Sequence, residues 1–248
     1  MKIYDDYIKF IDYLVNCISN GKYLYYQLSY IPEKKMNTEF LNRLDNKLDN
    51  KYQACLCKSE RLKLRRKNQA RHLYARYKNI IVLLKTDGDT DVASTDKWTD
   101  IRKHKIELRI SKYTTYNIGV GATKKKNNKS LDFTVSVTLG ADTVNYIKLT
   151  CIDCIRYQKD LKRLVYEWNK INGFNGWSGI NKQKLQLKEY LIKEVRKNFA
   201  IKQDKANKLF RVNTFKAKSE KDRLMKVFDS VDLAALIAEI QDSNNATE

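Results

Sequence analysis

The first third of the chain alternates between helix-like and strand-like patterns. Apolar residues recur at helical spacing near the start and predict a helix over residues 3–19. The segment 22–32 is aromatic and alternating, which predicts a strand. A second helix is predicted from a cap at Asn37 or Thr38 to about residue 57, because apolar residues again fall on one stripe.

The middle of the chain has the shorter period of β-strands. The β-branched run 79–85 predicts a buried strand. Further alternating segments predict strands over 104–113, 115–122, 132–139 and 144–150. From Thr150, which forms a capping-box pattern with Asp153, the spacing becomes helical. Helices are therefore predicted over 150–172 and 181–199, with further helix starts at Ser219 and Ser230.

This order of elements predicts an α+β fold. We expect a mostly antiparallel sheet of about five to six strands, with helices packed on one side and a helical C-terminal part. A single domain is expected over 1–215, a helical appendage over 216–241 and a disordered tail over 242–248.

The composition adds a strong positive charge to this picture. The chain of 248 residues has 49 Lys and Arg against 29 Asp and Glu, a net charge of +20. Such a balance favours a polyanionic partner, and nucleic acid, with DNA preferred to RNA, is the expected one. No apolar run approaches the roughly 18–20 residues that span a bilayer, so no membrane partner is expected. Two aspartates in the first ten residues argue against a signal peptide, and a cytoplasmic, nucleoid or organelle-interior location is expected rather than secretion.

The charge is concentrated in the segment 58–78, which contains nine Lys or Arg residues and one Glu. Arginine dominates it, and the guanidinium group is suited to phosphate. Tyr74 and Tyr77 are interleaved and are candidates to stack on bases. The pattern is compatible with both a strand and a helix. The candidate nucleic-acid-binding residues here are Lys58, Arg61, Lys63, Arg65, Arg66, Lys67, Arg71, Tyr74, Arg76, Tyr77 and Lys78.

A predicted hairpin loop supplies a second basic patch. Its candidate contacts are Lys124, Lys125, Lys126 and Lys129. The alternative for both patches is a solvated surface that serves solubility.

Chemistry has weaker support in the sequence. Asp87, Asp91 and Glu107 are candidate ligands for a catalytic Mg²⁺ at a strand end. There are two histidines, which are not adjacent, and no phosphate-binding or dinucleotide-binding glycine motif. We therefore lean towards a protein that is not an enzyme and needs no cofactor, with Mg²⁺ as the cofactor if it is one.

The five cysteines are expected to be reduced thiols, because the count is odd and no secretion signal is present. Four of them form two close pairs that are far apart in sequence, and the C-x-C spacing of the first fits zinc poorly. A zinc site is therefore not expected, although its candidate ligands are Cys55, Cys57, Cys151 and Cys154.

Together these features predict a DNA-binding protein. The arginine-rich segment running into an apolar strand and a turn resembles, in a general way, proteins of plasmids and similar mobile elements, and this predicts a role in their replication, maintenance or regulation. The alternatives are a metal-dependent nuclease, recombinase or replication initiator, and a structural RNA-binding protein. The sequence leaves the oligomeric state open.

Overall fold

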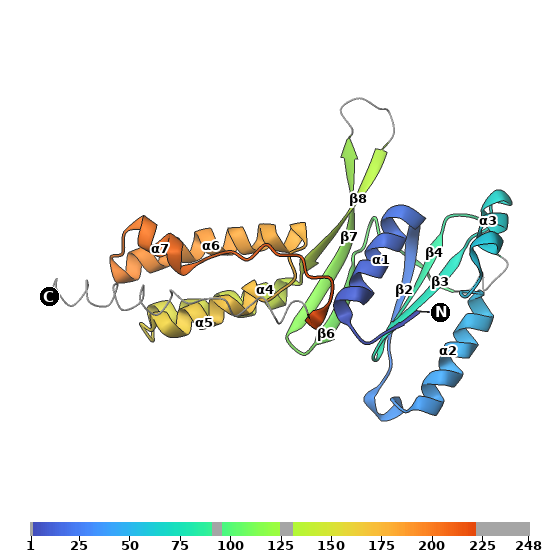
Figure 1. The fold of residues 1–248 in the computed structure, drawn as a ribbon, viewed down its shortest axis with the longest axis horizontal. Coiled ribbons are helices and arrows are strands. Elements are labelled where there is room, and N and C mark those ends of the chain that lie inside the picture. Colours follow the sequence, from blue (N-terminus) through green and yellow to red (C-terminus); the bar gives the residue numbers. More distant parts are fainter. Residues whose placement is uncertain (1, 91–95, 125–130, 222–248) are drawn as a thin grey trace. The chain divides into compact units, whose positions relative to one another are not determined.

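The computed structural model describes residues 2–90, 96–124 and 131–221 (Figure 1). Its α+β class agrees with the sequence prediction. By internal contacts the chain divides into two compact units: unit 1 is Met1–Ile110 with Tyr116–Ser136, and unit 2 is Ser111–Thr115 with Val137–Glu248. The boundary therefore falls within 110–137, whereas the sequence predicted one domain up to residue 215. The appendage predicted over 216–241 is described only up to residue 221, and the tail predicted over 242–248 lies outside the described residues.

Unit 1 is built on a five-stranded sheet with the order β1-β3-β4-β2-β5. Its strands are β1 (Lys2–Tyr4), β2 (Tyr23–Tyr30), β3 (His72–Tyr77), β4 (Ile80–Thr86) and β5 (Thr99–Asp100). β1 pairs parallel with β3, and the other neighbours are antiparallel. The strands predicted over 22–32 and 79–85 are thus confirmed as β2 and β4.

Helix α1 (Tyr7–Gly21) covers one face of this sheet. Its residue Phe10 stacks on Tyr77 of β3 at a ring-centroid distance of 5.8 Å. The predicted helix start at residue 3 was wrong, because the side chain of Asp6 caps α1 by accepting from Ile8 N at 2.8 Å. The residues before this cap form β1 and pair with β3.

Helix α2 (Thr38–Tyr52) covers the opposite face, so helices flank this sheet on both sides, whereas the sequence predicted one (Figure 1). The cap is Asn37, which accepts from Phe40 N at 2.8 Å and is one of the two residues that the sequence predicted for this role. Leu41, Leu44 and Leu48 pack against a cluster that includes Tyr74 of β3. Because strand side chains alternate, Tyr74 and Tyr77 point to opposite faces, which places the two helices on opposite sides. A short 3₁₀ turn (Glu33–Lys35) precedes α2.

A second sheet has the strand order β6-β7-β8. Its strands are β6 (Ile106–Ser111), β7 (Thr114–Lys124) and β8 (Leu131–Leu139), which confirms three predicted strands. Within unit 1, two tyrosines of β2 form hydrogen bonds with the backbone at the start of β6. The Tyr26 hydroxyl donates to Lys105 O at 2.9 Å, and the Tyr30 hydroxyl donates to Glu107 O at 3.0 Å.

Unit 2 is mainly helical. Its helices are α4 (Ala141–Arg156), α5 (Leu161–Asn172), α6 (Ser178–Phe199) and α7 (Gln203–Leu209). The strand predicted over 144–150 was wrong, because these residues lie in α4. Thr143, Ile147 and Cys151 are buried at a spacing of four, so the helical period decides this segment. The capping box predicted at Thr150 is also wrong, since the Thr150 hydroxyl donates to Tyr146 O in the helix interior at 2.9 Å.

The core of unit 2 includes a lysine. Lys184 of α6 is fully buried, and its ammonium donates to Phe174 O and Asn213 O, each at 2.8 Å. These two bonds tie the loop before α6 to the segment after α7, where the polypeptide lacks regular structure. Trp177 in the same loop is also buried.

Candidate nucleic-acid interface

The first part of the basic segment is a helix, α3 (Lys58–Arg66), and its last part is strand β3. Glu60 fixes the start of α3 by accepting from Cys57 N at 2.7 Å. This hydrogen bond to the backbone lowers the pKa of Glu60, so its charge is held at the positive end of the helix. The conformation that the sequence left open is therefore helix followed by strand.

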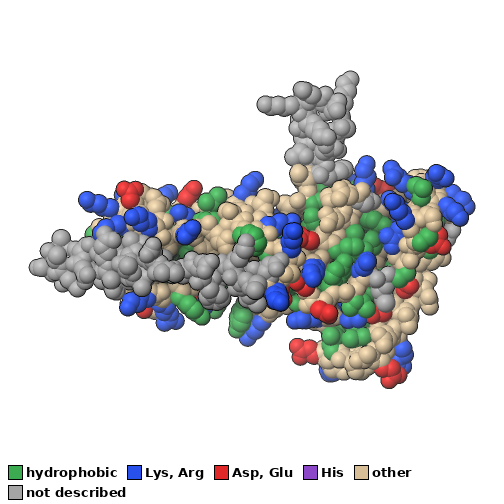
Figure 2. All heavy atoms as spheres, in the orientation of Figure 1, with side chains coloured by type: hydrophobic (Ala, Val, Ile, Leu, Met, Phe, Trp, Pro, Cys, Tyr) green, Lys and Arg blue, Asp and Glu red, His purple; other side chains and the backbone are tan. Residues whose placement is uncertain are grey.

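Five cations on and just after α3 are exposed, and we call them the α3 basic surface. They are Lys58, Lys63, Arg65, Arg66 and Lys67. Figure 2 shows Lys and Arg side chains gathered over this part of unit 1. Within the described part of the chain, no carboxylate lies within ion-pair distance of any of the five. The surface is thus a local concentration of positive charge without ion pairs in the described part of the chain, and the nearby carboxylate of Glu60 offsets only part of it.

Two further arginines of the segment are partly buried beside this surface. The Arg61 guanidinium donates from Nη2 to Ala54 O at 3.0 Å, which ties α3 to the beginning of the loop that follows α2. The Arg71 guanidinium lies over the Tyr23 ring at 5.6 Å, a cation–π distance. Both side chains therefore help to hold the local structure.

Three predicted contact residues lie in the core instead. Tyr74, Tyr77 and Arg76 are 1%, 3% and 7% exposed. A buried ring offers no face to a base, so neither tyrosine is available for stacking in this conformation. The reason is that strand β3 is covered on both sides, by α1 and by α2.

Arg76 is neutralised by an acid of α2. It donates to the Asp45 carboxylate from Nε at 3.0 Å and from Nη2 at 2.8 Å, and the Tyr74 hydroxyl donates to the same carboxylate. The side chains of Arg76 and Asp45 are 9% and 2% exposed. This charge therefore stabilises the fold and does not face a ligand.

Among the remaining basic candidates, Lys78 does not extend the α3 basic surface. Lys78 is exposed but follows the far end of β3, about 20 Å along the strand from its start at His72. Lys124 ends β7. Lys125, Lys126 and Lys129 lie outside the described residues.

The candidate catalytic acids are not brought together. The Asp87 side chain forms a hydrogen bond with the Tyr25 hydroxyl, and this bond raises the pKa of Tyr25. The pKa of Tyr26 is raised mainly by burial and also by the negative charge of Glu107, which therefore lies near Tyr26. Tyr25 and Tyr26 are neighbours on β2 and point to opposite faces, so the two acids lie on opposite sides of the sheet. Asp91 lies outside the described residues.

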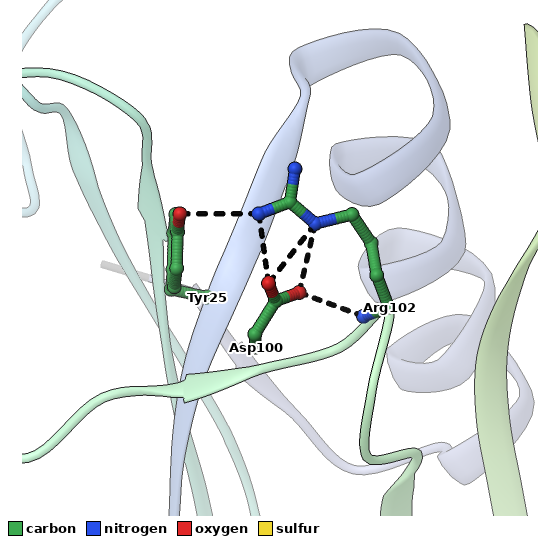
Figure 3. Close-up of polar contacts among 3 residues, drawn as sticks. All are labelled: Tyr25, Asp100 and Arg102. Atoms are coloured by element: carbon green, nitrogen blue, oxygen red, sulfur yellow. Dashed lines mark hydrogen bonds and ion pairs between the residues drawn. The ribbon is translucent and has the colours of Figure 1, made fainter. Parts of the chain in front are cut away.

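One exposed arginine at this end of the sheet already has an acid partner (Figure 3). Arg102 donates to Asp100 from Nε at 2.9 Å and from Nη2 at 2.8 Å, and Nη2 also donates to the Tyr25 hydroxyl at 3.1 Å. This pairing lowers the pKa of Asp100. In contrast to the α3 basic surface, Arg102 is therefore largely compensated within the protein.

The cysteine candidates are divided between the units. Cys55 and Cys57 are exposed in unit 1, and Cys151 and Cys154 are buried in unit 2. Burial raises the pKa of Cys151 to about 12, which keeps it a protonated thiol. Among the residues that the structure describes, no three His, Cys, Asp or Glu side chains form a group that could hold a metal ion.

Comparison with known proteins gave no matching family model, no matching curated protein and no matching solved structure. None of the helices in the described ranges is both long and apolar enough to cross a membrane. The physical properties of the site therefore carry the functional argument.

Proposed function

We propose that this protein binds duplex nucleic acid, with DNA as the expected ligand, through phosphate contacts made by the α3 basic surface. The observation that carries the proposal is the set of five exposed cations on and just after one short helix, without ion-pair partners in the described part of the chain. Arginine binds phosphate in a bidentate manner, and lysine adds a mobile point charge.

The burial of Tyr74 and Tyr77 favours the duplex over single strands as the ligand of this segment. Binding to single strands without sequence preference relies on stacking of bases on exposed aromatic rings. With its two tyrosines in the core, the segment 58–78 offers charge to a ligand and no ring. Contacts of this kind position a nucleic acid without reading its sequence.

The salt dependence of binding tests this proposal. We would titrate labelled duplex DNA, single-stranded DNA and duplex RNA by fluorescence anisotropy at several salt concentrations. Each lost phosphate contact should make the slope of log K against log salt shallower by about 0.9 for duplex DNA. The double variant Arg65→Ala/Arg66→Ala should therefore bind more weakly, with a slope shallower by about 2.

A matched control has the same charge change on another helix. Lys193 and Lys197 are exposed on α6, and Lys193→Ala/Lys197→Ala lowers the net charge equally. If this control keeps the wild-type slope and affinity, binding depends on where the cations lie and not only on the net charge. Equal losses in both variants, or no salt dependence in the wild type, would contradict the proposal.

The comparison among ligands ranks DNA against RNA. A role in the replication or maintenance of a mobile element stays a prediction. We do not propose the nuclease alternative, because Asp87 and Glu107 lie on opposite faces of the sheet.

A further inference from the structure

Unit 2 exposes three tyrosine rings close to one another. Tyr113, Tyr146 and Tyr166 are 57%, 48% and 66% exposed. Tyr146 lies on α4, Tyr166 on α5, and Tyr113 in the turn between β6 and β7. Leu149, one turn from Tyr146 on α4, is also 65% exposed. We call the three tyrosines the unit 2 aromatic surface, and exposed apolar groups that gather in this way mark interaction sites.

Two kinds of contact bring the three rings together. The Tyr113 ring stacks on the Tyr146 ring, with a centroid distance of 5.5 Å and an interplanar angle of 21°. Lys170 Nζ lies over the Tyr166 ring at 5.0 Å. Glu167 raises the pKa of Lys170, and Tyr166 and Tyr146 raise it to a smaller extent. Tyr146 and Tyr166 therefore lie near the same ammonium group.

Hydrogen bonds fix the turn that carries Tyr113 to the start of α4. The buried hydroxyl of Thr143 accepts from Thr115 N at 3.0 Å and donates to Tyr113 O at 3.1 Å. Both segments belong to unit 2, so these bonds lie within one compact unit. The stacked pair of Tyr113 and Tyr146 is thus formed before a ligand binds, which lowers the entropy cost of binding.

Lysines flank these rings. Lys112 lies over the Tyr113 ring at 5.2 Å. Lys162 and Lys170 each lie one helical turn from Tyr166 on α5. Lys170 has an acid partner on its own helix at 2.6 Å, whereas Lys112 and Lys162 form no ion pair within the described ranges. The rings therefore lie in a positively charged surrounding.

This mixture of rings and lysines fits a single nucleic-acid strand better than a protein partner. Surfaces that bind single strands combine aromatic rings, on which bases stack, with cations that follow the phosphates. The core of a protein interface is instead depleted in lysine. Asp142, one turn before Tyr146, offsets only part of the positive charge. Lys112 and Lys170 are exposed, so their flexible side chains can move to a phosphate and leave a ring face to a base.

We propose that the unit 2 aromatic surface binds single-stranded nucleic acid, with bases stacked on its exposed rings and phosphates beside the lysines that flank them. This function is distinct from the duplex binding proposed for the α3 basic surface and does not rest on it. Stacking accepts every base, so the binding should show little sequence preference. DNA and RNA strands offer the same chemistry here, and the experiment compares the two.

The test measures the affinity of the full chain for labelled oligo-dT and oligo-U of about 12 nucleotides, a length typical of single-strand sites. Tyr146→Ala/Tyr166→Ala removes two rings and should weaken binding by roughly 100-fold, since each stacked base contributes roughly tenfold. Tyr146→Phe/Tyr166→Phe keeps both rings and should bind as the wild type. Tyr157→Ala is the matched control, because it removes a ring that is 78% exposed at the other end of α4, about 16 Å along the axis from Tyr146.

The substituted side chains are exposed, so every variant should keep the wild-type midpoint of unfolding in denaturant. Strand binding that the alanine variant loses and the phenylalanine variant keeps, in a protein that does not bind duplex, would support this surface and contradict the proposed function. Duplex binding without strand binding would overturn this inference alone. Equal losses in the alanine variant and in Tyr157→Ala would also overturn it. So would self-association that the alanine variant abolishes while its strand binding is unchanged.

Discussion

Replacing Asp45 by asparagine removes the carboxylate that Arg76 faces inside unit 1. Arg76 would keep its charge, since an arginine does not lose its proton in a protein. Its side chain is 9% exposed, so water cannot replace the lost acceptor without a change in packing. The guanidinium would then be a buried charge without an anionic partner, and its acceptors would be neutral oxygens such as Lys78 O at 3.2 Å.

The expected loss of stability follows from this geometry. Removing one partner of a buried ion pair costs about 3–5 kcal/mol, a large share of the roughly 5–15 kcal/mol that stabilises a domain. The double variant Asp45→Leu/Arg76→Met leaves no buried charge and should cost less than Asp45→Asn alone. Glu39→Gln is the control on the same helix: its 3.4 Å pair with Arg43 is exposed, and such pairs contribute about 0–1 kcal/mol.

Hydrogen exchange of the β3 and β4 amides would measure these free energies within unit 1. The salt dependence of DNA binding should stay at the wild-type slope in Arg76 variants that remain folded, in contrast to variants of Arg65 and Arg66. A cost below about 1 kcal/mol for Asp45→Asn would refute the assignment of Arg76 to the core. A shallower salt slope in Asp45→Leu/Arg76→Met would instead indicate that Arg76 contacts the nucleic acid.

Two further predictions concern buried positions. Burial lowers the pKa of Lys184 from 10.5 to about 8. Between these two pH values the folded state therefore binds fewer protons than the unfolded state. The part of the unfolding free energy that Lys184 contributes should rise by up to roughly 3 kcal/mol as the pH increases across this range. Denaturant titrations of wild type and Lys184→Met across this range should show that rise as a difference, and parallel curves would contradict it. Gly88 has a φ of +123°, and a Cβ atom there would lie 2.6 Å from Asn68 O, so Gly88→Ala should cost about 1–3 kcal/mol. It should also weaken the hydrogen bond from Ala70 N to Asp89 O and so increase hydrogen exchange at the Ala70 amide. Gly121→Ala has space for its Cβ and should change neither quantity, and equal effects of the two variants would contradict the close approach at Gly88.

The sequence predicted elements whose local signals were unambiguous. The aromatic alternation of β2 and the cap at Asn37 each specify one structure, and both are present. The segment 144–150 satisfies both periods: Val144 and Tyr146 alternate, but Thr143 and Ile147 also lie one helical turn apart. These residues are helical because the helix buries one of its faces against other helices. The spacing of residues within the segment gives no information about those contacts.

The positive charge of the candidate site was predictable from the sequence, but which of its residues are exposed and which are buried was not. Arg76 and Arg66 look alike in the sequence, and only the fold brings Asp45, 31 positions away, against one of them. The close approach of the backbone at Gly88 was not predictable either, because Asn68 and Ala70 come from a separate segment of the chain.

The concentration of positive charge also affects the stability of α3 itself. None of the residues of α3 is buried, so packing contributes little to holding it. Arg61 and Arg65, and Lys63 and Lys67, are like charges four positions apart, and each such pair costs a few tenths of a kcal/mol, about 0.2–0.5. The Glu60 cap offsets part of this repulsion at the first turn only. A phosphate backbone along α3 would remove the repulsion over the rest of the helix. The like charges that destabilise the free helix would therefore stabilise its complex with nucleic acid.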